Sequence, residues 1–291
     1  MTVELSTTKR LRQQLAAGRV IAAGAFVPFV ARLVEEAGYD AIYVSGAALS
    51  NSLGYRDEGV LPRSRVLDFT REVVRVVRLP VIVDVDTGFG GPKGVAETVR
   101  LFEDAGAAAI QIEDQDPRWK RCGHLEGKHL IGRERMVEKL EAAVAARRDP
   151  GFVIIARTDA LAVEGYEQAV ARAQAYERAG VDVIFPEART SREMFEAFRQ
   201  TVSVPLLANM TEFGKSPWIT DEDFVALGYR LVLHPVTTFR FAAKQIRDAL
   251  AEIRAAGNQQ SLVNAGKLMN RGEIDSYLIP RIGMESRRSY G

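Results

Sequence analysis

The chain has 291 residues, of which 47% are hydrophobic and 26% are charged, a composition typical of a soluble globular protein. Its formal net charge of +1 gives no reason to expect a polyanionic partner such as a nucleic acid. A single cysteine excludes an intrachain disulfide framework, and no apolar run approaches the roughly 20 residues that cross a bilayer. Residues 1–19 are too polar for a signal peptide, so we expect a cytoplasmic protein with no membrane partner.

Short apolar runs recur along the chain and predict eight β-strands. Their residues are apolar throughout rather than alternately apolar and polar, which is typical of a parallel sheet covered by helices. In chain order the runs are Val20–Phe26, Ala41–Gly46, Pro80–Asp86, Ala108–Asp114, Phe152–Asp159, Asp182–Ala188, Pro205–Met210 and Tyr229–Pro235.

The segments between these runs predict helices, because apolar residues recur in them every three or four positions. Examples are Ser64–Val77, Gly94–Ala105, Arg133–Ala146, Tyr166–Ala179 and Ser191–Val202. A glycine separates the end of a helical segment from the next apolar run at Gly38, Gly106, Gly180 and Gly228. Because glycine closes helices in the left-handed conformation, this repeat predicts successive βα units.

Eight βα units that close on themselves form a (β/α)8 barrel of the TIM type, which commonly takes about 250 residues. An open doubly wound sheet is the alternative, but no glycine-rich dinucleotide motif follows the first strand. A long helix, Thr238–Ala256, and a helical tail from Ser261 follow the eighth unit. We therefore expect one domain over residues 1–291, with residues 258–291 as a helical C-terminal extension.

Nearly every predicted strand ends in a functional side chain. Because active sites of barrels lie at the carboxyl ends of the strands, these side chains are expected to surround one cavity. Helix capping is an alternative for Ser45, Asp86 and Thr211, but it does not explain Arg157 or Glu187 after an apolar strand. The full set is Ser45, Asp84, Asp86, Glu113, Asp114, Arg157, Asp159, Glu187, Asn209, Thr211 and His234.

Asp84 and Asp86 are two residues apart on one strand, so their side chains lie on the same face. Two carboxylates held together repel each other unless a cation or a proton lies between them. Oxygen ligands without paired histidines or a second cysteine favour Mg²⁺, with Mn²⁺ as the alternative, over zinc. Asp57 and Glu113 are further candidate ligands. Asp57 stands in the loop 54–59, which is either a lid over the cavity or a solvated turn.

The only cysteine, Cys122, follows two cations, Lys120 and Arg121, and precedes His124. Neighbouring positive charge favours the thiolate, which is the reactive form of the side chain. The alternative is a packing cysteine that acts as a small hydrophobe. Because this segment has glycines and few apolar residues, the sequence favours the reactive cysteine.

Arg157 and Arg240 are candidate anion holders. A guanidinium binds a carboxylate through two parallel hydrogen bonds and stays charged at any working pH. Arg157 ends a strand, where a solvated role is not expected. Arg240 begins a helix, where a plain surface position is equally favoured, and Arg271 in the tail is a weaker candidate.

Five stretches together resemble one protein superfamily. They are Lys-Arg-Cys-Gly-His at 120–124, Asp84–Gly90, Ile155–Ala160, Phe185–Ala188 and Leu207–Gly214. On these motifs the chain is similar to the isocitrate lyase and phosphoenolpyruvate mutase superfamily, and within it to the 2-methylisocitrate lyase family. The turn Tyr55–Gly59 departs from the Leu-Pro-Asp-Leu-Gly that is usual there but keeps the aspartate.

The resemblance implies a Mg²⁺-dependent carbon–carbon lyase that cleaves 2-methylisocitrate to pyruvate and succinate, a step of propionate catabolism in the methylcitrate cycle. Isocitrate, 2,3-dimethylmalate and oxaloacetate are the alternative substrates within the superfamily. A non-catalytic carboxylate-binding barrel is the alternative from another class. The resemblance also implies a homotetramer whose protomers exchange a terminal helix.

The resemblance further implies roles for individual residues. Cys122 would be the acid–base residue, and Asp84 and Asp86, together with Asp57, would bind Mg²⁺. The base that removes the substrate's hydroxyl proton is left open between Tyr43 and Glu113. The implied substrate contacts are Ser45, Gly46, Ala47, Gly123, His124, Arg157, Glu187, Asn209, Met210, Thr211, Arg240 and Arg271.

Overall fold

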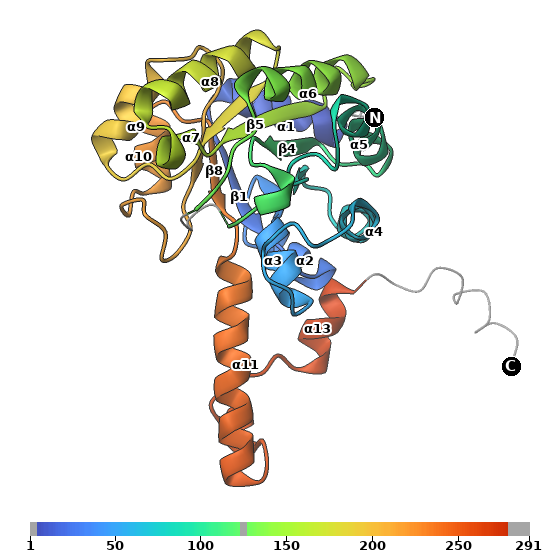
Figure 1. Cartoon of the computed structure of the whole chain (residues 1–291). Helices are drawn as coiled ribbons and strands as arrows, with labels where there is room; N and C mark the ends of the chain where they lie inside the picture. The colour runs from blue at the N-terminus through green and yellow to red at the C-terminus, as the bar shows by residue number, and fades with distance from the viewer. Residues whose placement is uncertain (1–4, 123–126, 279–291) are drawn as a thin grey trace, which may run out of the picture. The chain divides into compact units, whose positions relative to one another are not determined.

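The computed structural model describes residues 5–122 and 127–278, and its eight strands form one parallel sheet (Figure 1). The sheet runs in the order β6-β5-β4-β3-β2-β1-β8-β7, and the bridge between Ile184 and Leu206 brings its two edges together. The predicted (β/α)8 barrel is therefore confirmed. The strands are β1 Val20–Gly24, β2 Ala41–Val44, β3 Val81–Asp84, β4 Ala109–Glu113, β5 Val153–Thr158, β6 Val183–Pro186, β7 Leu207–Asn209 and β8 Leu231–His234.

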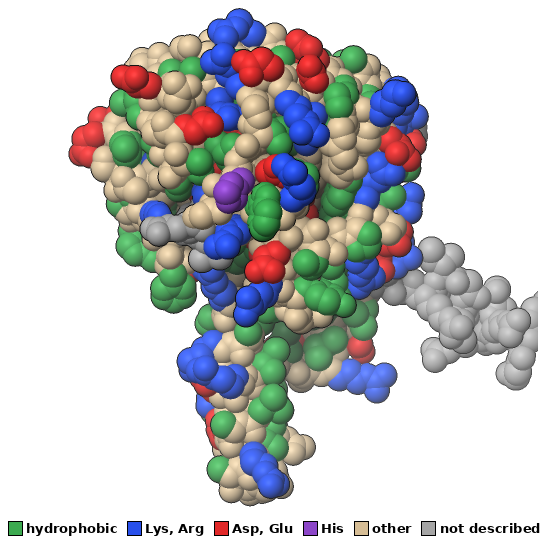
Figure 2. Space-filling view, in the orientation of Figure 1, with side chains coloured by type: hydrophobic (Ala, Val, Ile, Leu, Met, Phe, Trp, Pro, Cys, Tyr) green, Lys and Arg blue, Asp and Glu red, His purple; other side chains and the backbone are tan. Residues whose placement is uncertain are grey.

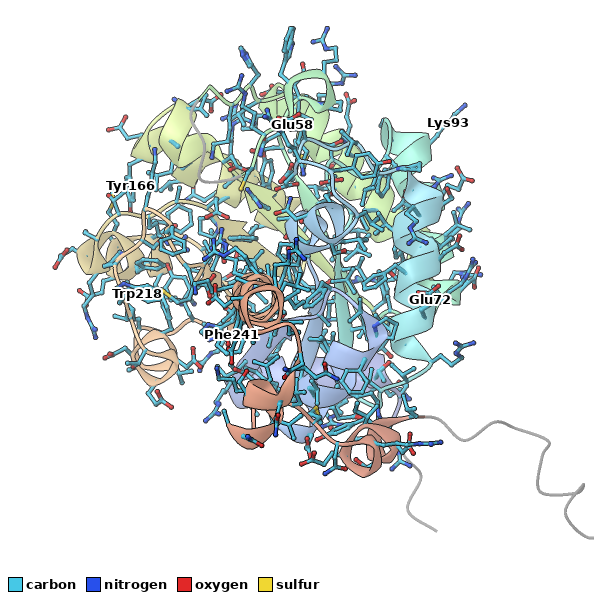
Figure 3. The ribbon with its side chains drawn as sticks, turned by 90° about the horizontal axis from the view of Figure 1, so that it is seen from below. Glu58, Glu72, Lys93, Tyr166, Trp218 and Phe241 are labelled. Carbon is cyan, nitrogen blue, oxygen red and sulfur yellow. The ribbon has the colours of Figure 1, made fainter. Side chains whose placement is uncertain are left out.

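Helices lie outside the strands, and charged side chains such as Glu72 and Lys93 extend from them away from the sheet (Figure 3). The helices predicted from apolar spacing are confirmed to within a few residues at their ends. They are α4 Arg63–Val74, α5 Pro92–Asp104, α6 Arg133–Ala146, α8 Tyr166–Arg178, α9 Arg192–Arg199 and α11 Thr237–Ala256. The remaining helices are α1 Thr7–Ala17, α2 Pro28–Glu36, α3 Gly46–Ser52, α7 Ala160–Val163, α10 Asp221–Ala226, α12 Gln260–Asn264 and α13 Arg271–Tyr277, with a 3₁₀ turn, η1, at Pro117–Trp119.

Both faces of the strands are buried, which explains why the sequence runs are apolar throughout. In β1, Val20 and Ala22 point into the barrel, whereas Ile21 and Ala23 pack under the helices. The barrel interior is filled by side chains rather than left as a channel. It contains Val20, Ala22, Ala41, Tyr43, Ile82, Ala109, Val153, Ile155, Val183, Phe185, Leu207, Leu231 and Leu233.

Helix α1 closes the amino-terminal end of the barrel. Ser6 caps it, and its Leu11 and Leu15 join the interior cluster. Arg12 donates to the carbonyl oxygens of Gly151 (3.1 Å) and Phe152 (3.0 Å) and pairs with Asp182 at 2.8 Å. Because side chains fill the amino-terminal end of the barrel, an open cavity is expected at the carboxyl ends of the strands.

The chain divides into two compact units, one up to Arg240 and one from Phe241 onward. The second unit contains most of α11 together with α12 and α13. Leu262 is buried within it, and Lys267 pairs with Glu252 at 3.1 Å. Apolar side chains stand exposed along α11 (Figure 2). Phe241, Ile246 and Leu250 are among the exposed large apolar residues. The single domain with a tail from residue 258 stays a prediction. No described helix has the length and apolarity that crossing a membrane requires.

Candidate active site

A cavity opens at the carboxyl ends of the strands, where the sequence predicts the site. Counted together with the open solvent at its mouth, the empty space is about 510 Å³. Most of the residues predicted from strand ends and motifs surround it. The lining residues are Tyr43, Ser45, Ala47, Asp57, Asp84, Cys122, Arg157, Phe185, Glu187, Asn209, Thr211, Leu233, Pro235, Val236 and Arg240.

Asp84 ends β3, and the backbone around it is fixed by its carboxylate. Its Oδ1 accepts hydrogen bonds from the backbone N–H of Asp86 (3.0 Å) and from Nε2 of Gln111 (3.3 Å). Its Oδ2 lies 3.4 Å from the backbone nitrogen of Gly46, where a Cβ would come within 3.1 Å of that oxygen. Asp86 has a left-handed backbone with φ of 49°, a strained conformation that non-glycine residues keep mainly at functional sites. Burial, and then the neighbouring Asp86, raise the pKa of Asp84 to about 6.

Lys120 is the buried cation of this carboxylate group. Its ammonium lies 2.7 Å from Oδ1 of Asp57 and also forms an ion pair with Asp86. Burial opposes the charge on Lys120, but Glu113, Asp86 and Asp57 outweigh it and hold the lysine pKa well above its ordinary value. Lys120, predicted as a cation beside the thiol, instead directs its ammonium at the carboxylates of Asp57 and Asp86.

The carboxylates outnumber the cations that face them. Among the described residues, Lys120 and Arg157 are the cations that act on the four carboxylates Asp57, Asp84, Asp86 and Glu113. Glu113 is 1% exposed, its Oε1 has no hydrogen-bond partner among the described residues, and burial raises its pKa well above the ordinary value despite Arg157 and Lys120.

This donor set fits a divalent cation bound through oxygen. Within residues 5–122 and 127–278, no three acidic, histidine or cysteine side chains are already grouped as a metal cage. A site built on Asp84 and Asp86 would therefore bind the ion through few protein ligands and several waters, as Mg²⁺ prefers.

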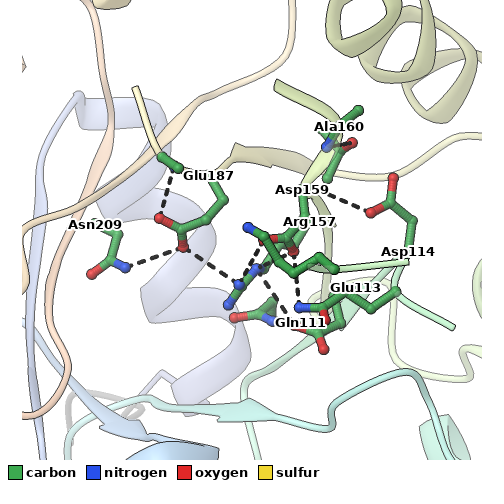
Figure 4. Close-up of polar contacts among 12 residues, drawn as sticks. Gln111, Glu113, Asp114, Arg157, Asp159, Ala160, Glu187 and Asn209 are labelled. Atoms are coloured by element: carbon green, nitrogen blue, oxygen red, sulfur yellow. Dashed lines mark hydrogen bonds and ion pairs between the residues drawn. The ribbon is translucent and has the colours of Figure 1, made fainter. Parts of the chain in front are cut away.

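Arg157 is the second-last residue of β5 and is held from three sides (Figure 4). Its Nε and Nη2 donate to the two oxygens of Asp159 at 3.0 and 3.1 Å, and Nε lies 3.4 Å from Glu113. Nη2 lies 3.7 Å from Glu187, and the guanidinium stacks over the ring of Phe185 at 5.2 Å. This geometry fixes a positive charge, 8% exposed, at the wall of the cavity.

Glu187 connects the ends of β6 and β7. Its Oε2 accepts a hydrogen bond from Nδ2 of Asn209 at 3.2 Å, and its Oε1 accepts one from the backbone N–H of Ala188 at 2.9 Å. Ala188 has φ of 59°, so strained backbone stands at a second point of the rim. The site therefore continues from the carboxylates of β3 and β4 to the ends of β6 and β7.

Tyr43 reaches the same carboxylates through an amide. Its hydroxyl donates to Oε1 of Gln111 at 2.5 Å, and Gln111 in turn donates to Asp84. Burial raises the pKa of Tyr43 well above its ordinary value, with Asp84 adding to the effect. Tyr43 is thus a protonated hydrogen-bond donor at neutral pH.

Cys122 is half-buried at the cavity wall. The residue before it is fixed by Gln115, whose Oε1 accepts from the backbone N–H of Arg121 (3.0 Å) and whose Nε2 donates to the carbonyl of Arg121 (2.9 Å). Gly123 and His124, both predicted as substrate contacts, lie outside the described residues.

Arg240 reaches the cavity from the first turn of α11. Its Nη1 donates to Oγ1 of Thr211 at 3.3 Å and lies 3.0 Å from Oε2 of Glu212. Met210 is buried, and its backbone N–H donates to the carbonyl of Leu233 at 2.8 Å. Arg271 belongs to the second unit, and its role as a substrate contact stays a prediction.

Sequence reasoning missed Gln111, Lys128 and the pairing of Lys120. Gln111 stands in the middle of β4, two residues before Glu113, and the alternation of strand side chains is the signal that could have found it. Lys128 pairs with Asp159, which is 31 residues further along the chain, and no sequence pattern predicts that contact.

The family model for phosphoenolpyruvate phosphomutase matches residues 10–254. The chain belongs to this family. A 2-methylisocitrate lyase from Aeropyrum pernix is 54% identical over 255 residues, covering 88% of this chain and 81% of that protein. The predicted superfamily is therefore confirmed.

Two solved structures of the superfamily share the fold over nearly their whole length. The structure of 2,3-dimethylmalate lyase matches with a TM-score of 0.88 and 33% identity, covering 99% of this chain and 95% of that one. A phosphonopyruvate hydrolase in complex with oxalate and Mg²⁺ matches with a TM-score of 0.84 and 32% identity, with 98% of each chain covered.

The raised pKa of Asp84 gives a prediction for the metal-free protein. In the folded state Asp84 keeps its proton up to about pH 6, compared with about 3.9 in an unfolded chain, so its stabilising contribution is complete below the unfolded pKa and is lost as the pH rises through 6. Asp84→Asn mimics the protonated carboxyl. In the presence of a chelator it should raise the free energy of unfolding at pH 7.5 by about 1–3 kcal/mol, and the gain should vanish near pH 4.

The measurement is urea unfolding at both pH values. Asp68→Asn, which removes an exposed carboxylate on α4, serves as the control and should show no such difference. An Asp84→Asn protein whose stability equals that of the wild type at pH 7.5 contradicts the prediction.

Proposed function

We propose that the protein is a Mg²⁺-dependent carbon–carbon lyase that cleaves 2-methylisocitrate to pyruvate and succinate in the methylcitrate cycle of propionate catabolism. The observation that carries the proposal is one cavity lined by the carboxylate of Asp84, the fixed guanidinium of Arg157 and the thiol of Cys122, with Asp86 hydrogen-bonded to Asp84 beside it. The identity of 54% to a 2-methylisocitrate lyase supports the substrate.

The proposed metal site consists of Asp84 and Asp86, with Asp57 and Glu113 acting directly or through water. Mn²⁺ is the alternative ion, because oxygen ligands suit both. A bound ion would supply electrostatic stabilisation for the alkoxide oxygen that forms when the substrate's hydroxyl loses its proton, before the carbon–carbon bond breaks. A solved Mg²⁺ complex of the phosphonopyruvate hydrolase relative supports this choice.

The substrate carries three carboxylates, and the cavity offers matching groups at its two ends. Ser45, Gly46 and Ala47 would hold the pyruvate-forming end beside the proposed metal site. Arg157 would bind a carboxylate of the succinate-forming end through its fixed guanidinium. The remaining contacts to that end would come from Glu187, Asn209, Thr211 and Arg240.

The base that removes the hydroxyl proton is, in this proposal, Glu113 rather than Tyr43. Glu113 has a raised pKa because it is buried, and a carboxylate with a raised pKa is a better base near neutral pH. Tyr43 is protonated and donates its hydrogen bond to Gln111, so it would orient Gln111 and Asp84 instead.

Cys122 would deliver a proton to the carbon that leaves as the succinate carbanion. Two proton movements are then separated in space: one leaves the hydroxyl on the β4 side of the cavity, and one arrives from the segment that follows η1. The half-buried position of the thiol at the cavity wall supports this role.

A panel of substrates tests the function. With Mg²⁺, the protein should release a 2-oxo acid from 2-methylisocitrate faster than from isocitrate or 2,3-dimethylmalate and faster than it releases oxalate from oxaloacetate, and a chelator should abolish the reaction. Asp86→Asn should weaken Mg²⁺ binding measured by calorimetry, because one of two carboxylate ligands is lost. A preference for 2,3-dimethylmalate would transfer the assignment to that activity, which the structural match at 33% identity makes the second candidate. No turnover of any of the four would favour a non-catalytic carboxylate-binding barrel.

Replacing the thiol tests the acid. Cys122→Ser keeps the size of the side chain nearly constant but raises the pKa of the proton donor by several units. Turnover should fall by about 10²–10⁴-fold, the usual contribution of general acid–base catalysis. Folding, measured by circular dichroism, and Mg²⁺ binding should stay unchanged. Wild-type turnover in the folded variant would return Cys122 to a packing role.

The exposed side of α11 suggests self-association. No residue of α11 is buried within one chain, and Ile246 and Leu250 are 58% and 61% exposed one helical turn apart. We propose a homotetramer in which the terminal helices are exchanged between protomers. Leu250→Asp should lower the mass measured by light scattering, whereas Arg254→Gln, an equal change of charge on the same helix, should not. A wild-type protein that is monomeric at micromolar concentration excludes the assembly.

A further inference from the structure

Asp159 is a buried carboxylate that does not line the cavity but contacts several groups behind its wall. It follows β5 directly and is 0% exposed. Its Oδ1 accepts from Nη2 of Arg157 at 3.1 Å and from Nζ of Lys128 at 2.6 Å. Its Oδ2 accepts from Nε of Arg157 at 3.0 Å and from Nε2 of Gln115 at 3.4 Å. One carboxylate therefore satisfies three side chains that come from three parts of the chain.

Two of these side chains stand on either side of the cysteine. Gln115 pairs with both backbone groups of Arg121, the residue before Cys122. Lys128, 2% exposed at its side chain, is the anchor on the far side of the segment. The positions of both anchors thus depend on the same carboxylate, which also fixes the guanidinium of Arg157.

The position of Asp159 is itself fixed by a second buried carboxylate. Its backbone N–H donates to Oδ1 of Asp114 at 3.0 Å (Figure 4). Oδ2 of Asp114 accepts from the hydroxyl of Tyr176 at 2.8 Å. Arg172 adds a longer contact to Asp114 at 3.4 Å. A satisfied buried network of this kind is rigid, because each member has few alternative partners.

Asp159 is held in its charged form. Burial opposes ionisation, but Arg157 and Lys128 outweigh it and leave the pKa of Asp159 below its ordinary value. Two cations facing one carboxylate would repel each other if that charge were removed. The positions of Arg157 and Lys128 therefore both depend on the negative charge of Asp159.

We propose that Asp159 is a positioning residue that fixes the guanidinium of Arg157, the backbone of Arg121 through Gln115, and the side chain of Lys128 relative to one another. The inference rests on the proposed function in one respect, that Arg157 binds substrate carboxylate and Cys122 supplies a proton. If so, Arg157 and Cys122 are not independent. A substitution in the hydrogen-bond network behind Arg157 should change the surroundings of the Cys122 thiol.

Because Cys122 is the only cysteine, its alkylation by iodoacetamide reports on this segment without interference. Lys128→Met removes one anchor and keeps the pair between Arg157 and Asp159. It should change the alkylation rate of the folded protein by about 3- to 30-fold, the range for loss of one coupling contact. Lys128→Arg keeps the ion pair and should restore a rate close to wild type. Gln115→Met, which leaves no unpaired charge, should change the rate in the same direction as Lys128→Met.

Asp159→Asn should change the alkylation rate and, in addition, weaken the protection of Cys122 by bound succinate, because Arg157 loses its fixed orientation. The control is Asp182→Asn, which breaks an ion-pair cluster at the opposite end of the barrel, with Arg12 and Arg147. It should lower the thermal midpoint while leaving the alkylation rate and the protection unchanged.

The inference is wrong if folded Lys128→Met and Gln115→Met proteins are alkylated at the wild-type rate. These two variants also test the inference if the Asp159→Asn protein does not fold. A wild-type protein that succinate fails to protect would argue against the proposed function alone, because the alkylation rates of the variants need no substrate.

Discussion

An excess of buried negative charge at the carboxyl ends of the strands is the constraint on which the site depends. Taking a carboxylate out of water is costly unless a cation or hydrogen bonds compensate, and β3, β4, β5 and β6 each end near such a group. Lys120, Arg157 and Lys128 supply the compensation, and each is itself buried. A divalent cation at Asp84 and Asp86 would complete the balance of charge, so the affinity for metal and the folding of this rim share one origin.

Strained backbone appears where this charge is concentrated. Asp86 and Ala188 have positive φ, and each follows a strand that ends in the cavity wall. Such conformations cost about 1–3 kcal/mol each and persist only where the surroundings fix them. Here the surroundings are hydrogen bonds from the backbone N–H of Asp86 to Asp84 and from that of Ala188 to Glu187. The carboxylates that bind ligands in the proposed reaction are therefore also the groups that hold the rim in its strained form.

Much of the fold and part of the site could be predicted from the sequence, because these features depend on patterns among residues that are close together in the chain. The strands of a barrel are buried on both faces, so each appears as a continuous apolar run, and the first polar residue after the run marks the rim. This rule finds Asp84, Arg157 and Glu187. It cannot find what each side chain touches: Lys120 meets Asp57 across 63 residues of chain. Such contacts depend on how loops from different βα units meet, which no local pattern encodes.

In the proposed enzyme, the groups that break the carbon–carbon bond lie at strand ends, whereas other groups around the substrate lie in loops. Asp84, Glu113 and Arg157 stand at the ends of strands held by parallel ladders, so the groups needed for breaking the carbon–carbon bond have little freedom to shift. Asp57, Cys122 and Arg240 come from loops or from the first turn of a helix. Two relatives named for different activities share this fold at TM-scores above 0.8, and loops are the parts of a barrel that most often vary between such enzymes. In this chain the anchor between those two groups is Asp159, because it contacts Arg157 on the strand and Lys128 beyond the cysteine.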